Sequence, residues 1–483
     1  MNLFNGIHEE CGVFGVYDPN QANHVTSLTY TALYALQHRG QESCGIAVNN
    51  DGVIVSHKDL GLVPEVFNQE VLNRLGTGEI AVGHVRYSTT GNHNRSNAQP
   101  LVIRHVKGPM VLAHNGNLTN AWELREQLEM SGAIFHSTND SEVISYIITK
   151  ERLNSKSIEQ AVEQAMYQIK GAYSMVIMSP TKLIAVRDPN GFHPLCIGRL
   201  GDATIFASET CALDTIGAEF VRDVKPGEIV IVDKKGMRSI ETHCGGKSSL
   251  CVFEFVYFAR PDSVVDGASV HNARLRAGAF LALEHPVQAD VIIGVPDSGL
   301  DAALGFARQS GIPYGVGFIK NRYIGRTFIQ PTQGQRENAV KLKLNAVRAT
   351  VQGKRVVMID DSIVRGTTMK RIVSLLREAG ATEVHIRISS PPFVNPCYFG
   401  TDIDSKDKLI ACRMSTEEIC KEFGADSLGY LSINGVKQIA ESCSLNFCSA
   451  CFDGNYPAEI PKETHKDKFE SRISESEDKA SFN

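Results

Sequence analysis

Residues 356–368 combine side-chain types that can bind a phosphorylated sugar. They read Val-Val-Met-Ile-Asp-Asp-Ser-Ile-Val-Arg-Gly-Thr-Thr, so a buried-strand pattern ends in two acids and a loop leads into a helix. N–H groups at a helix N-terminus and the threonine hydroxyls can hold a phosphate, and the glycine permits close backbone approach. The paired carboxylates suit ribose hydroxyls or Mg²⁺. An ordinary polar turn is the competing interpretation, but the joint pattern favours binding. The candidate ligands are Asp360, Asp361, Ser362, Arg365, Gly366, Thr367 and Thr368.

This segment resembles the phosphoribosyl pyrophosphate signature of type I phosphoribosyltransferases. The resemblance implies that the acids face the ribose and metal and that the loop after them holds the 5′-phosphate. Residues 295–299, Val-Pro-Asp-Ser-Gly, match the position of the pyrophosphate loop of that family, which would place Ser298 near magnesium. Pro-Asp-Ser-Gly is also a common turn, so this loop alone is weak evidence.

Residues 320–327 form a basic, glycine-containing stretch after an apolar strand. Taken alone, a solvated loop is the simpler interpretation. Beside a pyrophosphate site, Lys320, Arg322 and Tyr323 become candidates for a lid, because a polyanion needs cations and closure would exclude water.

Cys11 is a candidate nucleophile because of the motifs that follow it. These are Gln-His-Arg-Gly-Gln-Glu at 37–42, Gly-His-Val-Arg-Tyr-Ser-Thr at 83–89, His-Asn-Gly-Asn-Leu at 114–118, and Asp140 opening a helix. Together they resemble the class II, N-terminal-nucleophile glutamine amidotransferase domain, over roughly Cys11 to Lys235. The nucleophile of that family must begin the mature chain, because its free α-amino group, with a pKa of about 8, serves as the general base. We therefore expect residues 1–10 to be a propeptide, removed by self-cleavage.

The resemblance also implies roles for individual residues. The catalytic set is Cys11, Asn115 and Gly116, with the last two stabilising the oxyanion. The glutamine-binding set is Arg86 for the carboxylate, Asp140 for the ammonium, and Thr89. Asp140 could instead be a helix N-cap, and Asn115-Gly116 a type I′ turn. Because all of the motifs occur together and in the order of the family, a glutamine site is favoured over these separate structural alternatives.

A C-x-x-C pair at Cys448 and Cys451 suggests zinc, an iron–sulfur cluster or a redox pair. The contexts of Cys251 and Cys397 match the cluster-bearing, propeptide-bearing branch of the amidophosphoribosyltransferases, which this chain resembles almost end to end. The resemblance implies that these four cysteines ligate a structural [4Fe–4S] cluster, whereas spacing alone leaves zinc as a rival. Cys443 is an additional candidate. The six remaining ones are interpreted as ordinary, often buried residues: Cys44, Cys196, Cys211, Cys244, Cys412 and Cys420.

The first half of the chain must position the nucleophile, and its pattern predicts an α+β fold. Short strands are expected at residues 13–17, 46–48, 80–87, 110–114, 173–178, 182–187 and 203–207. One helix should follow Asp140, and another should open at Ser157, where Ser157-x-x-Gln160 has the pattern of a capping box. The resemblance implies the αββα sandwich of N-terminal-nucleophile hydrolases.

The second half alternates strands and helices. Strands at 291–295, 356–359 and 384–388, the first two followed by amphipathic helices, predict a parallel sheet with crossover helices, an α/β type I phosphoribosyltransferase fold. Polar residues at 235–249 suggest the boundary. The predicted organisation is a propeptide at 1–10, an amidotransferase domain at 11–243, a phosphoribosyltransferase domain at 244–461, and a charged tail at 462–483.

The composition fits two ordinary globular domains. The chain has 483 residues, 42% hydrophobic and 21% charged, with a net charge of −5, which argues against a dedicated nucleic-acid binder. The apolar runs are only strand-sized, and no signal-peptide pattern opens the sequence, so we expect no membrane association and a cytoplasmic location. Thiols stay reduced there, so the twelve cysteines suggest catalysis or metal binding.

Together the resemblances imply a pentosyltransferase that moves the amide nitrogen of glutamine to 5-phosphoribosyl 1-pyrophosphate, with Mg²⁺ and the cluster as cofactors. The expected products are 5-phosphoribosylamine, glutamate and pyrophosphate, at the first step of purine synthesis. The family resemblance also implies a homotetramer inhibited by purine nucleotides. A ligand-sensing repressor and an inactive iron–sulfur sensor are the alternatives. The acidic composition speaks against the first, and the complete set of glutaminase residues against the second.

Overall fold

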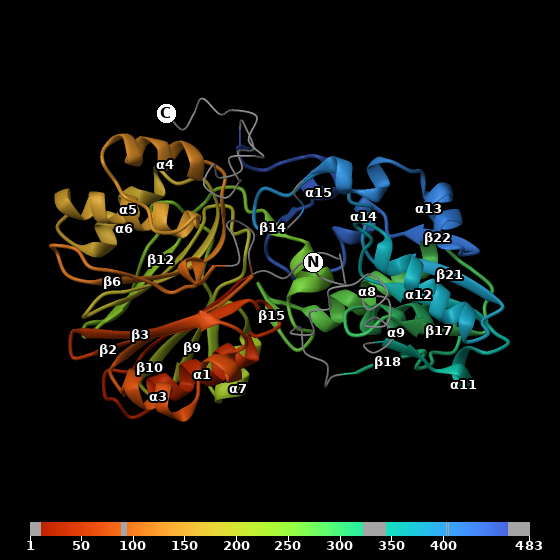
Figure 1. Cartoon of the computed structure of the whole chain (residues 1–483), viewed down its shortest axis with the longest axis horizontal. Helices are drawn as coiled ribbons and strands as arrows, with labels where there is room; N and C mark the ends of the chain where they lie inside the picture. Colours follow the sequence, from red (N-terminus) through yellow and green to blue (C-terminus); the bar gives the residue numbers. More distant parts are fainter. Residues whose placement is uncertain (1–10, 88–93, 322–343, 402, 404, 462–483) are drawn as a thin grey trace. The chain divides into compact units, whose positions relative to one another are not determined.

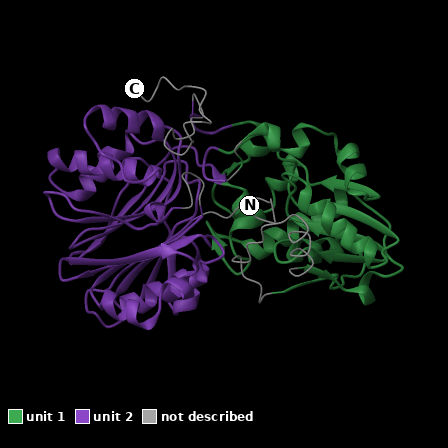
Figure 2. Cartoon of the chain, in the orientation of Figure 1, with its two compact units in different colours: residues 1–8, 251–397, 403–455 green, residues 9–250, 398–402, 456–483 purple. Residues whose placement is uncertain are grey.

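The computed structural model describes residues 11–87, 94–321, 344–401, 403 and 405–461 (Figure 1). The predicted site residues Thr89, Arg322 and Tyr323 lie outside these ranges, as do the predicted propeptide and tail. The chain divides into two compact units (Figure 2). The N-terminal unit contains the described residues up to Leu250 together with 398–401 and 456–461, and the C-terminal unit contains the rest.

The N-terminal unit is built on two antiparallel sheets. The seven-stranded sheet has the order β11 (Glu219–Asp223), β9 (Cys196–Leu200), β10 (Ala203–Ala207), β1 (Gly12–Tyr17), β4 (Ile80–Arg86), β2 (Ser43–Asn50) and β3 (Val53–Leu60). The six-stranded sheet has the order β13 (Gly236–Ile240), β12 (Ile229–Asp233), β8 (Leu183–Arg187), β7 (Gly171–Met178), β6 (Met110–Leu118) and β5 (Leu101–Ile103).

Helices cover the outer face of each sheet. Helices α1 (Val25–Ala35), α3 (Gln69–Leu75) and α7 (Thr210–Ile216) lie on the seven-stranded sheet, and α4 (Ala121–Met130), α5 (Asp140–Asn154) and α6 (Ile158–Met166) lie on the six-stranded sheet (Figure 1). Strand β1 shows why its run is wholly apolar. Alternate side chains face opposite ways, so Val13 and Tyr17 pack between the sheets while Phe14 and Val16 pack toward the helices. The predicted αββα sandwich is confirmed.

The helix starts differ from the expectation in one detail. Ser157 caps α6 by accepting a hydrogen bond from the Gln160 N–H at 3.3 Å, as predicted. The Gln160 side chain accepts instead from the N–H of Lys156 at 3.0 Å, so the reciprocal half of the capping box is displaced by one residue.

The C-terminal unit contains a parallel sheet in the order β17 (Val291–Gly294), β20 (Arg355–Asp360), β21 (Glu383–Ile388) and β22 (Ser427–Tyr430). Helices α8 (Val270–Glu284), α9 (Gly299–Ser310), α12 (Thr367–Glu378) and α13 (Thr416–Phe423) accompany it (Figure 1). The predicted parallel fold is confirmed. Parallel strands share one carboxyl edge, so the loops after β17 and β20 meet there.

The division between the units departs in detail from the predicted domains. Residues 244–250 belong to the N-terminal unit, and residues 398–401 and 456–461 return to it from the second half of the sequence. Short strands β14 (Leu250–Cys251) and β23 (Phe447–Cys448) pair beside the division. Among the described residues, none of the helices has the length and apolar character needed to cross a membrane.

Candidate active sites

Cys11 is fixed by the start of the strand that follows it. Gly12 pairs with Val85 of β4, and Cys11 itself is 8% exposed. Its Sγ donates a hydrogen bond to the Tyr87 carbonyl at 3.3 Å, and its own carbonyl oxygen accepts one from Arg39 Nε at 3.0 Å. The candidate nucleophile is therefore held by both its side chain and its main chain.

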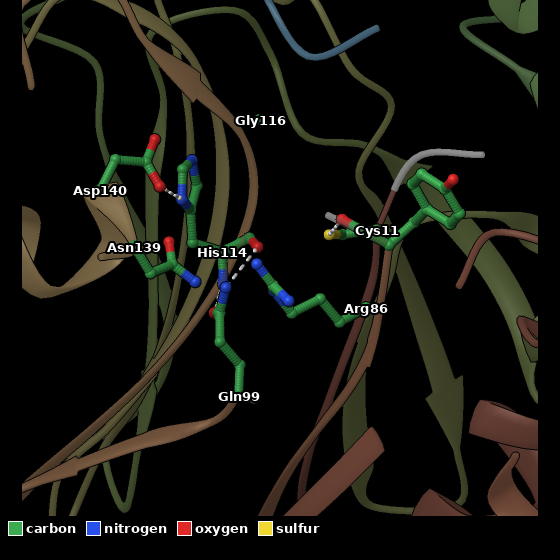
Figure 3. A pocket seen from close by; sticks show the side chains of 8 residues that line it. Cys11, Arg86, Gln99, His114, Gly116, Asn139 and Asp140 are labelled. Atoms are coloured by element: carbon green, nitrogen blue, oxygen red, sulfur yellow. Dashed lines mark hydrogen bonds and ion pairs between the residues drawn. The ribbon is translucent and has the colours of Figure 1, made fainter. Parts of the chain in front are cut away.

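A cavity of about 230 Å³, part of it open to solvent, lies beside this sulfur. Figure 3 shows Cys11 and Arg86 on one side and His114, Asn139 and Asp140 on the other. Both sheets and the start of α5 contribute to it, so residues far apart in sequence converge. The lining residues are Cys11, Arg86, Tyr87, Gln99, His114, Gly116, Asn139 and Asp140.

Asn115 and Gly116 lie inside β6, paired with Ser174 and Tyr173 of β7, so the alternative of a type I′ turn is wrong. Gly116 has φ 140°, and a Cβ there would lie 2.2 Å from the Ala172 carbonyl oxygen, so only glycine fits. Asn115 is 1% exposed, and its Nδ2 has no hydrogen-bond partner among the described residues. A buried, unsatisfied donor is costly unless a ligand uses it. This geometry suits stabilisation of an oxyanion.

Asp140 is the first residue of α5, and the helix cap is Asn139, whose side chain accepts from the Ser141 N–H at 3.0 Å. The N-cap alternative for Asp140 is therefore wrong. The Asp140 carboxylate accepts from the Leu118 N–H at 2.9 Å and lies 3.6 Å from His114 Nδ1 (Figure 3). Burial would raise the pKa of this carboxyl, but His114 and the hydrogen bonds lower the pKa below its ordinary value. The group is a buried anion at the helix N-terminus.

Arg86 ends β4, and its guanidinium Nη1 lies 3.2 Å from Glu42 Oε2, with both side chains buried. Glu42 thus orients the group predicted to bind the glutamine carboxylate.

The two sheets are joined at this level, because His84 Nε2 donates to the His114 carbonyl at 3.0 Å. Five residues of this region had no role predicted from sequence: His84, Glu42, Gln99, His114 and Asn139. Three of them, His84, Glu42 and His114, lie within the motifs, which is the sequence signal that could have indicated a role.

The second site lies at the carboxyl edge of the parallel sheet in the C-terminal unit. Both oxygens of the Asp361 carboxylate accept hydroxyl hydrogen bonds, one from Ser298 and one from Ser362. Burial, together with the charge of Asp361, raises the pKa of Asp360 well above its ordinary value, and burial likewise raises the pKa of Asp361. A divalent cation would relieve this repulsion, and the oxygen donors fit Mg²⁺.

The loop after the two acids is shaped by Gly366, which has φ 82° and precedes the first residue of α12. A Cβ there would lie 2.7 Å from Ile410 Cδ1 and 2.9 Å from Phe423 Cζ. Thr368 Oγ1 is buried and has no hydrogen-bond partner among the described residues, as expected of a phosphate donor. Of the predicted lid, Lys320 is described, and its Nζ lies 2.6 Å from Asp297 of the loop after β17.

The predicted cluster cysteines are brought together within the C-terminal unit. Strand pairing sets Cys251 beside Cys448, whose carbonyl accepts from the Val252 N–H at 3.2 Å. Burial raises the pKa of the Cys448 thiol to about 12 and raises the pKa of Cys451 well above its ordinary value, and the neighbouring Cys397 contributes to both shifts. A partly buried set of thiols fits a thiophilic metal or an iron–sulfur cluster.

The cysteines interpreted as ordinary divide into three groups by their exposure. Cys44, Cys196 and Cys211 are buried, as expected, and Cys244 and Cys420 are partly buried. Cys412 is exposed, which differs from the expectation, because it lies in a short 3₁₀ turn at the surface.

Comparisons with known proteins agree with both sites. Residues 84–215 match the model of a glutamine amidotransferase domain, and residues 270–393 that of a phosphoribosyl transferase domain. The chain is 51% identical over 464 residues to an amidophosphoribosyltransferase from Synechocystis, covering 95% of this chain and 93% of that one.

The chain belongs to the amidophosphoribosyltransferase family.

Two solved structures extend this family assignment to the fold. The structure described as the allosteric regulatory enzyme of purine biosynthesis has a TM-score of 0.89 at 48% identity, covering 94% of this chain and 98% of that one. The glutamine phosphoribosylpyrophosphate amidotransferase from B. subtilis complexed with ADP and GMP has a TM-score of 0.87 at 47% identity, covering 94% and 99%. The predicted fold class and enzyme class are confirmed by membership of the amidophosphoribosyltransferase family.

Proposed function

We propose that this chain transfers the amide nitrogen of glutamine to 5-phosphoribosyl 1-pyrophosphate, giving 5-phosphoribosylamine, glutamate and pyrophosphate. This is the first step of purine synthesis, in agreement with the families and relatives that the chain matches. The observation that carries the proposal is the cavity beside Cys11, where a buried sulfur faces a buried anion at Asp140 and a cation at Arg86. A free amino acid carries both complementary charges.

The first half-reaction uses the N-terminal unit. In a mature chain that begins at Cys11, the α-amino group takes the thiol proton while the sulfur attacks the amide carbon of glutamine. Asn115 Nδ2 and the Gly116 N–H stabilise the oxyanion, Arg86 and Thr89 bind the carboxylate side, and Asp140 binds the ammonium. The α-ammonium then gives its proton to the amide nitrogen, which leaves as ammonia, and water hydrolyses the resulting thioester to glutamate and the free thiol.

The second half-reaction uses the C-terminal unit. Ammonia attacks C1 of the ribose, the bond from C1 to the pyrophosphate oxygen breaks, and the new ammonium loses a proton to give the amine. Mg²⁺, when bound, neutralises charge on the departing pyrophosphate. Asp360, Asp361 and Ser298 would hold the metal and ribose. The 5′-phosphate ligands are Ser362, Arg365, Gly366, Thr367 and Thr368, and the covering residues are Lys320, Arg322 and Tyr323.

The iron–sulfur assignment concerns Cys251, Cys397, Cys448 and Cys451, which we propose as ligands of a [4Fe–4S] cluster. The proposal rests on the resemblance of the contexts of Cys251 and Cys397 to the cluster-bearing branch of the family, and on the pairing of Cys251 with Cys448 in neighbouring strands. Zinc is the rival metal for the same thiols. We expect the cluster to stabilise the fold.

Regulation, assembly and maturation complete the proposal. A relative has been solved with ADP and GMP, so purine nucleotides are the expected inhibitors. We also propose a homotetramer in the cytoplasm and removal of residues 1–10, which frees the amine that Cys11 needs as its base.

The test is an intact native mass of anaerobically purified protein together with two activity assays. A mature chain that starts at Cys11 and carries four irons and four sulfides supports the maturation and cluster assignments. Cys11→Ser should abolish glutamine-dependent synthesis while ammonia-dependent synthesis persists. Retention of residues 1–10 in an active enzyme, or no turnover of phosphoribosyl pyrophosphate with either nitrogen source, would contradict the proposal.

A further inference from the structure

The segment between β10 and α7 has no role in the chemistry proposed above, yet Ser208 and Glu209 are both buried. Ser208 contacts the strand that begins at the nucleophile. Its Oγ accepts from the Val13 N–H at 2.9 Å, and its N–H donates to the Val13 carbonyl at 3.0 Å. These two hydrogen bonds therefore hold the main chain at Val13, two residues beyond Cys11.

Glu209 reaches Cys11 through one intermediate side chain. Arg39 Nη1 lies 2.7 Å from Glu209 Oε1, and Arg39 Nε donates to the Cys11 carbonyl oxygen at 3.0 Å. Both side chains are completely buried. Charge-assisted hydrogen bonds gain strength in such surroundings, and the planar guanidinium transmits orientation from one partner to the other. The carboxylate thus fixes the arginine that holds the nucleophile.

His38 donates to the same carboxylate oxygen. Its Nε2 lies 2.7 Å from Glu209 Oε1, and its Nδ1 lies 3.1 Å from the Ala35 carbonyl oxygen. Both ring nitrogens therefore face oxygen acceptors. Burial would raise the pKa of Glu209, but His38 and Arg39 lower the pKa well below its ordinary range. Glu209 is therefore a buried anion that is paired with the Arg39 cation and also contacts His38.

The same group could be interpreted as a metal site, because Cys211 Sγ lies 3.6 Å from Glu209 Oε2. A metal ion there would share the carboxylate with the buried Arg39 guanidinium. Arg39 already matches the single charge of this buried carboxylate and cannot lose its proton, so a metal ion would add uncompensated positive charge. The contacts therefore favour a charge-matched support over a metal site.

A nucleophile at a chain end needs such support, because termini fray unless they are tied down. In the mature chain, Cys11 would carry both the thiol and the amine, with no preceding residue to hold them. A displacement of about 1 Å in a reacting group can cost roughly 10²-fold in rate. We infer that Glu209 is a positioning residue for glutamine cleavage, which holds Arg39 and thereby the main chain of Cys11 in its reactive geometry. This inference rests on the glutaminase function proposed above.

The test is Glu209→Gln in the full-length protein, which keeps the shape of the side chain and removes its charge. We expect glutamine-dependent kcat to fall by at least tenfold with KM for glutamine within about twofold, because position and not substrate binding is lost. Ammonia-dependent synthesis, which does not use Cys11, should stay within about twofold of the wild-type rate. Intact mass should show the same N-terminus in both proteins.

The matched control is Glu228→Gln. Glu228 is likewise a buried glutamate of the N-terminal unit paired with an arginine, and its Oε1 lies 2.7 Å from Arg222 Nη2. Among the described residues its side chain bonds to Arg222, Ser239 and the Lys225 N–H, and not to Cys11 or Arg39. This variant should keep its glutamine-dependent kcat within about twofold.

Four results would overturn the inference. They are an unchanged kcat in Glu209→Gln, an equal loss in Glu228→Gln, a raised KM as the main effect, and retention of residues 1–10 in Glu209→Gln alone. If Glu209→Gln loses ammonia-dependent synthesis as well, the substitution has damaged the whole protein. The test then uses a variant of the half-buried His38. His38→Gln should lower kcat several-fold with KM unchanged, and an unchanged kcat overturns the inference. Failure of the wild-type protein to use glutamine would instead refute the proposed function.

Discussion

Acidification should weaken the N-terminal unit through one buried histidine. His84 of β4 is completely buried, and its Nε2 donates to the His114 carbonyl of β6 at 3.0 Å. Its Nδ1 is buried and has no hydrogen-bond partner among the described residues. A proton on Nδ1 would place a charge where no acceptor is available, and burial accordingly lowers the pKa of His84 to about 3. The ring is neutral in the native state and fastens the two sheets at the glutamine cavity.

The size of the effect follows from proton linkage. An unfolded histidine has a pKa of about 6.5, so between roughly pH 6.5 and pH 3 the unfolded chain binds a proton that the folded chain excludes. The free energy of unfolding therefore falls as pH decreases through this window. For one such ring the loss is about 2 kcal/mol between pH 7 and pH 5, and about 3 kcal/mol by pH 4.

Urea unfolding can measure this loss in the N-terminal unit, because Trp122, the only tryptophan of the sequence, lies in its helix α4. The variants are His84→Gln, which keeps an N–H donor but cannot titrate, and His136→Gln, a control whose ring is 82% exposed. The decrease in stability from pH 7 to pH 5 should be smaller by about 2 kcal/mol in His84→Gln only. The same pH dependence in His84→Gln and the wild-type protein would refute the reasoning.

Three further predictions concern the proposed sites. Asp140→Asn should raise KM for glutamine by about 10- to 100-fold through loss of one charged contact, with ammonia-dependent synthesis unchanged, and an equal KM would contradict its role. Gly366→Ala should raise KM for phosphoribosyl pyrophosphate in the ammonia assay and lower stability by about 1 kcal/mol or more, because both φ and space forbid a Cβ. Its control is Gly424→Ala, at φ 70° with nothing within 4 Å, and an equal change in KM there would rule out a specific effect. Cys451→Ser should lose iron and sulfide by metal analysis, while Cys412→Ser, at the surface, should retain both; iron retained in Cys451→Ser would remove it as a ligand.

The apolar runs of the sequence predict most of the strands that are buried on both faces, but the prediction omits β12, although its apolar residues are buried, and also the more exposed strands β3 and β13. Strands β1, β7 and β20 are buried on both sides, so their apolar runs are visible without any knowledge of their neighbours. Strand β13 is almost wholly exposed, and β22 is only partly buried, so neither carries an apolar run. Tertiary pairing, and not local preference, makes these segments strands.

The residues around Cys11 also show which features a sequence can predict and which depend on the folded structure. Cys11, Arg86, Asn115 and Asp140 lie in or beside recognisable motifs, and the structure brings three of them to one cavity with Gly116. The pairing of Arg86 with Glu42 joins residues 44 positions apart, and that of Arg39 with Glu209 joins residues 170 apart. Such contacts depend on strand register, which no single segment encodes.

The return of residues 398–401 to the N-terminal unit bears on how the protein is made. Phe399 stacks on the buried Phe192 with ring centroids 4.2 Å apart, its carbonyl accepts from His193 Nε2 at 2.8 Å, and Asn117 Nδ2 donates to the Tyr398 carbonyl at 3.0 Å. Synthesis must therefore continue well past Leu250, through most of the C-terminal unit, before the N-terminal unit can be completed. A chain ended at Leu250 would expose the face of Phe192 and remove two backbone acceptors. Although most residues of the N-terminal unit are synthesised first, the unit can finish folding only when nearly the whole chain has been made.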